Sequence, residues 1–394
     1  MYPKVSVALI TYNHEKYIRQ AIEGVLIQTY RNIEIVVADD CSTDRTMEIV
    51  LEYKEKYPEI FKILKTEANL GPAKNFRKLL HACDGDYIAL LDGDDFWVDP
   101  EKLEIQVNFL VKNHDYALCF HQARILKLNR EAAFGEFIPP KRETTPLEYN
   151  IEDVMNDLFM PTASVVYRNG YYKEIPEWFE ELIVCDKPLH LINLINGKVK
   201  YINKCMCVYR VHDDGIWSTK RKLNTIKFDR NKVKMLQYFN DYSNAKFNEM
   251  VYKAIKKCEF RILLNSIKTL VEKDDFYINI EEVNIVGKKI RNFLKDKKVY
   301  VFGTGTAGLN VKELLDYIQI PIVSFIDNDL SKKGKKIDGI IPIDSIEEID
   351  STQDIYIIVG SMYYEEISRQ LVDLGFLENR QFTMYLDLLI TIDN

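Results

Sequence analysis

Short, continuous apolar runs alternate along the chain with longer stretches whose apolar residues recur every three or four positions. The runs at Val5–Ile10, Ile33–Ala38 and Tyr87–Leu91 have the character of strands that are buried on both faces. Between them, residues 15–28 and 47–53 have the spacing of amphipathic helices. Strands that alternate with helices in this way predict an α/β fold with a parallel sheet and right-handed crossovers.

Each of the three apolar runs leads into polar or aromatic residues. The first is followed by Tyr12, the second by Asp40, and the third by Asp92, Asp94 and Asp95. Because the carboxyl ends of parallel strands form one edge of a sheet, we expect these side chains to surround one ligand site. Carboxylates so close together repel one another, and hard oxygen ligands favour Mg²⁺ or Mn²⁺. The alternative is an acidic turn without chemistry ahead of the next helix.

The pattern changes farther along the chain. Residues 129–150 lack periodicity, which predicts a loop, and residues 220–290 have helical spacing. A new strand at 299–302 predicts a further α/β region. The domains expected are therefore residues 1–219, a helical linker region at residues 220–296, and residues 297–394.

The last region contains a glycine-rich turn between a predicted strand and a predicted helix. Gly303, Gly305 and Gly308 have the dinucleotide-binding spacing, and Asp327 follows about twenty residues later at the end of the next strand. Fewer than 100 residues remain, which is about half of a dinucleotide-binding fold. The two interpretations are a C-terminal nucleotide site formed by these four residues and a structural or docking module.

Composition narrows the class of protein. The net charge of −7 argues against nucleic acid as a partner, and no apolar stretch is long enough to span a membrane. Seven scattered cysteines indicate buried thiols in a reducing compartment rather than disulfides. We therefore expect a cytoplasmic protein. A basic stretch around Lys253, Lys256, Lys257 and Arg261 would allow peripheral contact with the inner face of the cell membrane, the alternative being a solvated helix.

Several motifs in the first 110 residues resemble one family when they are taken together. The matching segments are Val5–Val7 through Tyr12-Asn13, Gln28–Tyr30, Ile35–Asp44, Asn69–Gly71, and Gly85–Ile88 leading into Asp92–Asp95. The chain resembles the inverting glycosyltransferases of family 2, which have the GT-A fold. The resemblance implies a GT-A nucleotide-diphospho-sugar transferase domain, and the C-terminal region is similar to small Rossmann-like domains appended to sugar-modifying enzymes.

The resemblance also implies roles for particular residues. Tyr12 would pack against the nucleotide base, Asp40 would hydrogen-bond its edge, and Asp95 would face the transferred sugar. The residues implied in donor-nucleotide binding are Thr11, Tyr12, Asn13, Asp40, Asn69, Lys74, Asp92 and Gly93. The alternatives without ligand binding are a core aromatic for Tyr12, a helix-entry cap for Asp40, and a solvated side chain for Lys74.

Within this resemblance, Asp94 and His212 would bind a divalent cation, and Asp186 would be the catalytic base. A strand pair is expected between Tyr201 and His212, with Arg210 orienting the site or contacting phosphate. Asp186 opens a predicted helix, whose dipole lowers the pKa of a carboxylate, so a base there needs burial as an offset. The alternatives are an N-cap for Asp186 and a hydrogen-bonding loop histidine for His212.

The function that the resemblance implies is transfer of a sugar from a nucleotide-diphosphate donor, expected to be a UDP-sugar, to an acceptor hydroxyl in one inverting, metal-dependent displacement. The acceptor would be a glycan, a lipid-linked sugar or a protein of the flagellin type. Two other classes remain open: an NAD(P)-dependent oxidoreductase based on the region around Gly303, and a non-catalytic sugar-nucleotide-binding protein.

Overall fold

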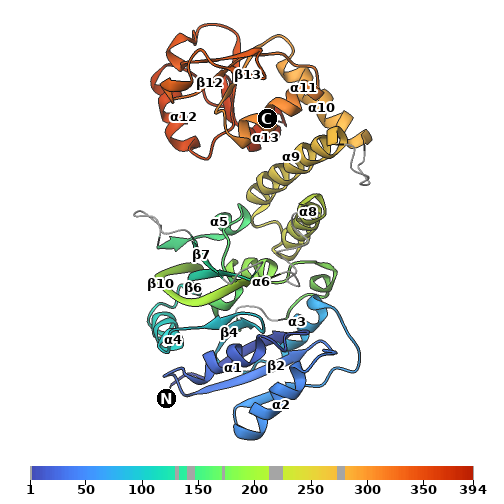
Figure 1. Cartoon of the computed structure of the whole chain (residues 1–394), viewed down its shortest axis with the longest axis vertical. Helices are drawn as coiled ribbons and strands as arrows, with labels where there is room; N and C mark the ends of the chain where they lie inside the picture. Colours follow the sequence, from blue (N-terminus) through green and yellow to red (C-terminus); the bar gives the residue numbers. More distant parts are fainter. Residues whose placement is uncertain are drawn as a thin grey trace. The chain divides into compact units, whose positions relative to one another are not determined.

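The computed structural model describes residues 2–128, 133–139, 147–170, 174–212, 225–272 and 280–393. The chain divides into two compact units, Met1–Leu223 with Gln237–Met250, and Asn224–Leu236 with Val251–Asn394. Each unit has its own sheet and its own hydrophobic core (Figure 1). The helical region that was expected to link two domains is shared between the units, because α8 (Thr225–Tyr242) contributes residues to both.

Over the described residues, the first unit is built on a sheet in the order β3-β2-β1-β4-β9-β6-β10-β5, with β7 paired to β6 and β8 to β10. Its strands are β1 (Val5–Thr11), β2 (Ile33–Asp39), β3 (Phe61–Leu64), β4 (Tyr87–Asp92), β5 (Phe96–Trp97), β6 (Tyr116–Lys127), β7 (Ala133–Ile138), β8 (Glu148–Tyr149), β9 (Val166–Arg168) and β10 (Lys198–Val211). Strands β1 to β4 are parallel to one another, as predicted. Strand β9 runs antiparallel to β4 and β6.

Two expectations about this sheet were wrong. The loop predicted at 129–150 contains β7 and β8, which extend the sheet by pairing with β6 and β10. The strand pair predicted near residue 205 is a single strand, β10, which runs parallel to β6. Its register shifts between Ile202 and Cys205 and again between Cys205 and Cys207, so the polar residues there interrupt the regular alternation without ending the strand.

The main core of the first unit lies on one face of β1, β2 and β4. Helices α1 (Ile18–Leu26), α2 (Thr46–Lys56) and α4 (Lys102–Lys112) bury apolar residues there against Val5, Val7 and Leu9. The other helical segments of this unit are α3 (Pro72–His81), α5 (Ile151–Met155), η1 (Thr162–Ser164), η2 (Glu177–Glu181) and α6 (Asp186–Leu194).

The strand register places the predicted site residues at one edge of the sheet. Thr11 on β1 is paired with Asp39 on β2, and Ile10 is paired with Asp92 on β4. The loops that carry Tyr12, Asp40 and Asp94 therefore leave the sheet side by side.

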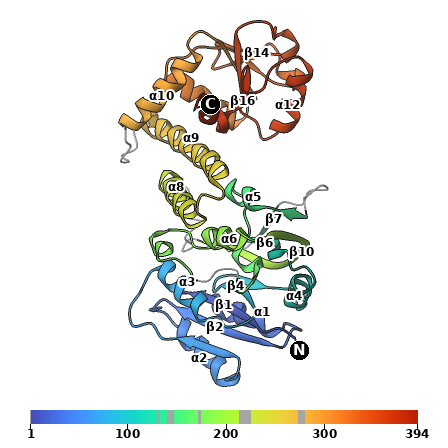
Figure 2. The ribbon, with the colours of Figure 1, turned by 180° about the vertical axis from the view of Figure 1, so that it is seen from behind.

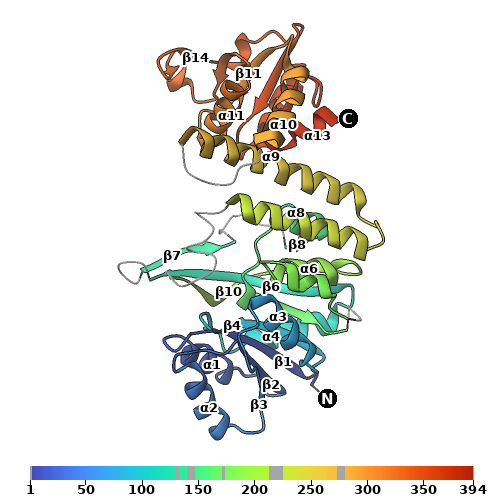
Figure 3. The ribbon, with the colours of Figure 1, turned by 90° about the vertical axis from the view of Figure 1, so that its right-hand side faces the viewer.

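The second unit has a smaller sheet (Figure 2). Its strand order is β13-β14-β12-β11-β15-β16. Its strands are β11 (Lys298–Phe302), β12 (Ile322–Ile326), β13 (Lys336–Ile337), β14 (Ile341–Asp344), β15 (Ile355–Val359) and β16 (Phe382–Met384), and the helices and 3-10 turns are α9 (Asn248–Glu272), α10 (Ile280–Leu294), α11 (Thr306–Tyr317), η3 (Leu330–Lys332), η4 (Ile346–Glu348), α12 (Tyr364–Asp373), η5 (Tyr385–Asp387) and α13 (Leu388–Asp393). Apart from the β13–β14 pair, the strands are parallel. Figure 3 shows α10, α11 and α13 beside this sheet.

The basic stretch of α9 is used within the second unit. Three of its basic side chains lie within 2.6 to 3.3 Å of carboxylates. The pairs are Lys256 with Asp393, Lys257 with Asp387, and Arg261 with Asp229. Across the described residues, no helix is both long and apolar enough to cross a bilayer.

Candidate active site

The loop after β1 leaves an aromatic ring in solvent. Asn13 has a φ of 55°, a left-handed conformation that asparagine tolerates better than most residues. Its side-chain oxygen accepts from the backbone N–H of Thr43, and its own N–H donates to Ser42 Oγ, both at 2.8 Å. These contacts tie the loop after β1 to the loop after β2. Tyr12 remains 43% exposed, which suits a stacking surface for a flat ligand.

Asp40 connects the end of β2 to the start of α3. Its carboxylate oxygens accept from the backbone N–H groups of Leu70 and Gly71, at 2.7 and 2.9 Å. Asn69 donates its side-chain amide to the backbone carbonyl of Asp40 at 2.9 Å. Asp40 is 4% exposed and therefore has a structural role at the entry to α3. Because each carboxylate oxygen has two lone pairs, this role still leaves acceptor capacity for the edge of a base.

The acidic turn after β4 depends on a close approach to the loop after β1. The N–H of Gly93 donates to the carbonyl of Ile10 at 2.8 Å. A Cβ at Gly93 would lie 2.7 Å from Thr11 Oγ1 and 2.8 Å from His14 Nδ1. Glycine is therefore required for the acidic turn to pack against Thr11 and His14.

Asp94 is the point where distant parts of the chain meet. His212 Nε2 lies 3.0 Å from Asp94 Oδ2, and His14 Nε2 lies 3.8 Å from the same oxygen. Burial raises the pKa of Asp94, but the hydrogen bond from His212 and the charge of His14 outweigh it and lower the pKa below its ordinary value. The structure thus brings together the two predicted metal ligands, Asp94 and His212, and adds His14, which the sequence analysis did not select.

Asp92 and Asp186 lie in the same site as Asp94. Burial raises the pKa of Asp92 to about 8, and the charges of Asp94 and Asp186 act in the same direction. Thr162, which the sequence analysis also did not select, hydrogen-bonds the Asp92 carboxylate, and this bond acts to lower the pKa of Asp92. Three carboxylates from β4, the acidic turn and α6 therefore share one electrostatic environment.

Asp186 has the burial that a base at a helix N-terminus needs. It is the first residue of α6, and its Oδ1 accepts from the backbone N–H of Lys187 at 2.7 Å. Burial raises its pKa above the ordinary value despite that hydrogen bond. The direction of the shift suits proton acceptance.

Asp95 and Arg210 are packed beneath the acidic turn. Asp95 is 1% exposed and accepts from the backbone N–H of Arg210 at 2.8 Å. The Arg210 guanidinium lies between the rings of Phe96 and Tyr17, 4.4 and 5.1 Å from their centroids, and donates to Gln20 and to the carbonyl of Asp94. These contacts tie Arg210 to the backbone of the acidic turn.

Lys74, the remaining predicted donor contact, lies on α3. Its side chain is 55% exposed, and its Nζ is 3.8 Å from Glu180 Oε2. Glu180 is held more closely by Arg77, at 2.9 Å. Lys74 is thus a largely solvated cation whose side chain can reorient.

The residues present fit a cation that also binds phosphate. Among the residues that the structure describes, no group of three or more His, Cys, Asp and Glu side chains has a metal-binding arrangement. Asp94 and His212 together offer one carboxylate oxygen and one imidazole nitrogen. A site with few protein ligands is typical of Mg²⁺ or Mn²⁺ bound with substrate phosphates and water.

The glycine-rich turn of the second unit is explained largely by packing. A Cβ at Gly308 would lie 1.9 Å from the carbonyl oxygen of Gly303, which itself has a φ of 104°. The space around Gly305 is open. Asp327, the predicted ribose contact, pairs with Lys332 at 2.8 Å and accepts from the hydroxyl of Thr304. The acid is therefore already engaged within the unit.

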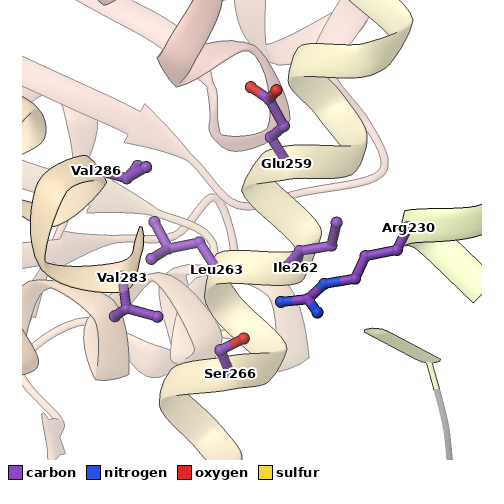
Figure 4. Close-up of a pocket in the computed structure, with 7 residues that line it drawn as sticks. All are labelled: Arg230, Glu259, Ile262, Leu263, Ser266, Val283 and Val286. Carbon is purple, nitrogen blue, oxygen red and sulfur yellow. The ribbon is translucent and has the colours of Figure 1, made fainter. Parts of the chain in front are cut away.

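A cavity of about 140 Å³ lies elsewhere in the second unit, between α8, α9 and α10 (Figure 4). Aliphatic side chains and three polar residues line it: Arg230, Glu259, Ile262, Leu263, Ser266, Val283 and Val286. None of the residues selected from the sequence lies in it.

Comparison with known proteins bears on the first unit in particular. The model of the family described as glycosyl transferase family 2 matches residues 6–170, and a model described as C2185-like, N-terminal, matches residues 295–382. An uncharacterized protein of Mycobacterium tuberculosis is 36% identical over 215 residues, which cover 54% of this chain and 60% of the relative.

A named relative is the Escherichia coli UDP-Glc:alpha-D-GlcNAc-diphosphoundecaprenol beta-1,3-glucosyltransferase WfgD. It is 35% identical over 140 residues, 36% of this chain and 53% of WfgD. The chain therefore spans roughly half to three fifths of the length of these relatives.

Among solved structures, that of S. aureus TarS in complex with UDP-GlcNAc superposes with a TM-score of 0.54. The sequence identity is 21%, over 73% of this chain and 81% of the TarS chain. At this identity the match shows a shared fold. It confirms the GT-A-type α/β fold that was predicted for the first unit.

Proposed function

We propose, from the premise that residues 6–170 form a glycosyl transferase family 2 domain, that this chain transfers a sugar from a UDP-sugar to an acceptor hydroxyl with inversion. The observation that carries the proposal is the gathering of Asp92, Asp94, Asp186 and His212 in one site at the carboxyl edge of the sheet. The name of WfgD, a UDP-glucose-dependent relative, supports UDP as the nucleotide.

In an inverting displacement, each of these residues would have a separate role. Asp186 would accept the proton of the attacking hydroxyl, because its pKa is raised by burial and it lies close to Asp92. Tyr12 would provide the stacking face for the base, and Asp40 would accept a hydrogen bond from its edge. Asp95, packed beneath the acidic turn, would face the transferred sugar. A divalent cation held by Asp94 and His212 would supply positive charge for the departing diphosphate.

The proposal is tested by nucleotide binding followed by turnover. We expect UDP to bind more tightly than GDP, CDP or ADP in calorimetry, and we expect its affinity to rise when Mn²⁺ is added. Incubation with a panel of UDP-sugars and Mn²⁺ should then release UDP. Failure of every nucleoside diphosphate to bind would refute the proposal, whereas UDP binding without any sugar transfer would favour a non-catalytic binding protein.

A further inference from the structure

Two imidazoles flank one carboxylate oxygen in the first unit, and only one of them is hydrogen-bonded to it. The separation of 3.0 Å between His212 Nε2 and Asp94 Oδ2 is a hydrogen-bond distance. The separation of 3.8 Å between His14 Nε2 and the same oxygen is too long for one. The Nε2 atom of His14 therefore faces the Asp94 carboxylate but is not hydrogen-bonded to it.

The orientation of the His14 ring is fixed from the opposite side. Its Nδ1 lies 3.2 Å from Thr11 Oγ1, and its backbone N–H donates to Thr46 Oγ1 at 2.8 Å. Gly93 leaves the space that the ring occupies, since a Cβ there would come within 2.8 Å of Nδ1. The His14 side chain keeps 19% of its surface exposed, so a ligand can reach the ring.

The diphosphate of a donor needs N–H groups beside Asp94. Among the residues predicted to bind the donor, Lys74 has the cationic side chain, and it is largely solvated beside Glu180. The guanidinium of Arg210 is occupied by Gln20 and the carbonyl of Asp94. An imidazole N–H held beside the acidic turn meets this need, because hydrogen bonds to phosphate oxygens are charge-assisted.

We propose that His14 is a further donor-binding residue, whose Nε2–H donates to an oxygen of the second phosphate of the bound nucleoside diphosphate. The inference rests on the proposed function, because it assumes a diphosphate ligand. The rival role is that of a third protein ligand to the cation, and the binding of Mn²⁺ without nucleotide separates the two roles.

The test compares UDP with UMP, which has the same base and sugar but lacks the second phosphate. Calorimetry with Mn²⁺ present would measure both affinities for the wild-type protein, His14→Ala, His14→Gln and His81→Ala. His81 is an exposed histidine at the end of α3 and serves as the matched control. Binding of Mn²⁺ alone would be followed by electron paramagnetic resonance, and melting curves would verify folding.

For His14→Ala we expect UDP affinity to fall roughly tenfold or more, with UMP and Mn²⁺ affinities changed less than about twofold. The amide N–H of glutamine should restore part of the loss in His14→Gln, and His81→Ala should match the wild type. Equal losses for UDP and UMP would overturn the inference, and so would weaker Mn²⁺ binding without nucleotide. If the wild-type protein binds no nucleoside diphosphate, the proposed function fails first, which is a separate result.

Discussion

Asp94 concentrates the contacts of the site on one side chain. The carboxylate of Asp94 is hydrogen-bonded to His212 and lies near His14, and the backbone carbonyl of Asp94 accepts a hydrogen bond from Arg210. Removing the charge of Asp94 should therefore affect phosphate and cation binding more than base binding.

For Asp94→Asn we expect the increase in UDP affinity caused by Mn²⁺ to fall by about 10- to 100-fold, because the amide keeps the shape but loses the anionic ligand. Calorimetry with and without Mn²⁺ measures this. Asp115→Asn, on an exposed aspartate, is the control. Unchanged Mn²⁺ dependence in Asp94→Asn would contradict the assignment of Asp94 as a ligand.

Asp186 offers the sharpest test of the catalytic step. Asp186→Asn should lower kcat by about 10²- to 10⁴-fold, the usual contribution of a general base. Its affinity for UDP should stay within about twofold of the wild-type value, because the predicted nucleotide contacts lie on other elements. Ordinary transfer rates in this variant would exclude Asp186 as the base.

The sequence indicated some site residues and missed others for physical reasons. Asp92, Asp94 and Asp186 stand at the ends of apolar runs or at a helix start, where a pattern identifies them. His14 was missed because it sits in an ordinary polar loop, and its approach to Asp94 depends on the packing that Gly93 allows. Its position two residues after Tyr12, at a strand end, was the one available signal.

Helix α4 contains a fully buried lysine, Lys102. Its Nζ lies 4.0 Å from the centroid of the Trp97 ring with no hydrogen-bond partner among the described residues. Burial lowers the pKa of Lys102 to about 7. The cation–π contact offsets only part of the cost of removing the charge from water.

Lys102→Met should therefore raise the free energy of unfolding at pH 7 by about 1–3 kcal/mol. From about pH 7 to 10.5 the unfolded chain holds a proton on Lys102 that the folded protein lacks, so this cost to the folded state shrinks as pH rises. The advantage of the variant should decrease accordingly, and urea denaturation at pH 7, 8 and 9 measures it. Lys112→Met, at the exposed end of α4, should show no such trend.

The elements that could be predicted were those with a long, uniform pattern. Strands β1, β2 and β4 are unbroken apolar runs, and α6 begins at Asp186 as expected. A strand pair was predicted between Tyr201 and His212, yet β10 is one strand, whose pairing with β6 continues past the polar Asn203 and Lys204 through a register shift. Strand β7 has little pattern of its own, and its pairing with β6 decides its structure.

For the whole molecule, the important feature is that each unit has a core of its own. Gly308→Ala would force a Cβ to within 1.9 Å of the Gly303 carbonyl oxygen, so we expect the second unit to lose about 3 kcal/mol of stability or more. Urea unfolding followed by hydrogen exchange measures this, and UDP affinity in the first unit should stay unchanged.

The matched control for this prediction is Gly305→Ala. Gly305 is the N-cap of α11 and has open space around it, so the added methyl group should cost about 0.5–1 kcal/mol, the difference between Gly and Ala at an N-cap. Equal destabilisation by both variants would show that the Gly308 contact has no special importance. The glycine spacing alone could not separate a packing role from nucleotide binding, since both need close backbone approach.

The register shifts of β10 have an evolutionary consequence. Two of the three shifts lie between Ile202 and Cys207, so the strand already absorbs irregular spacing there, upstream of Arg210 and His212. Natural insertions or deletions should be tolerated in that short span. The insertion or deletion of one residue after Val208, by contrast, would exchange the two faces of the strand and move Arg210 away from the acidic turn. Length variation among descendants of this chain should accordingly gather before residue 207 and be absent just after it.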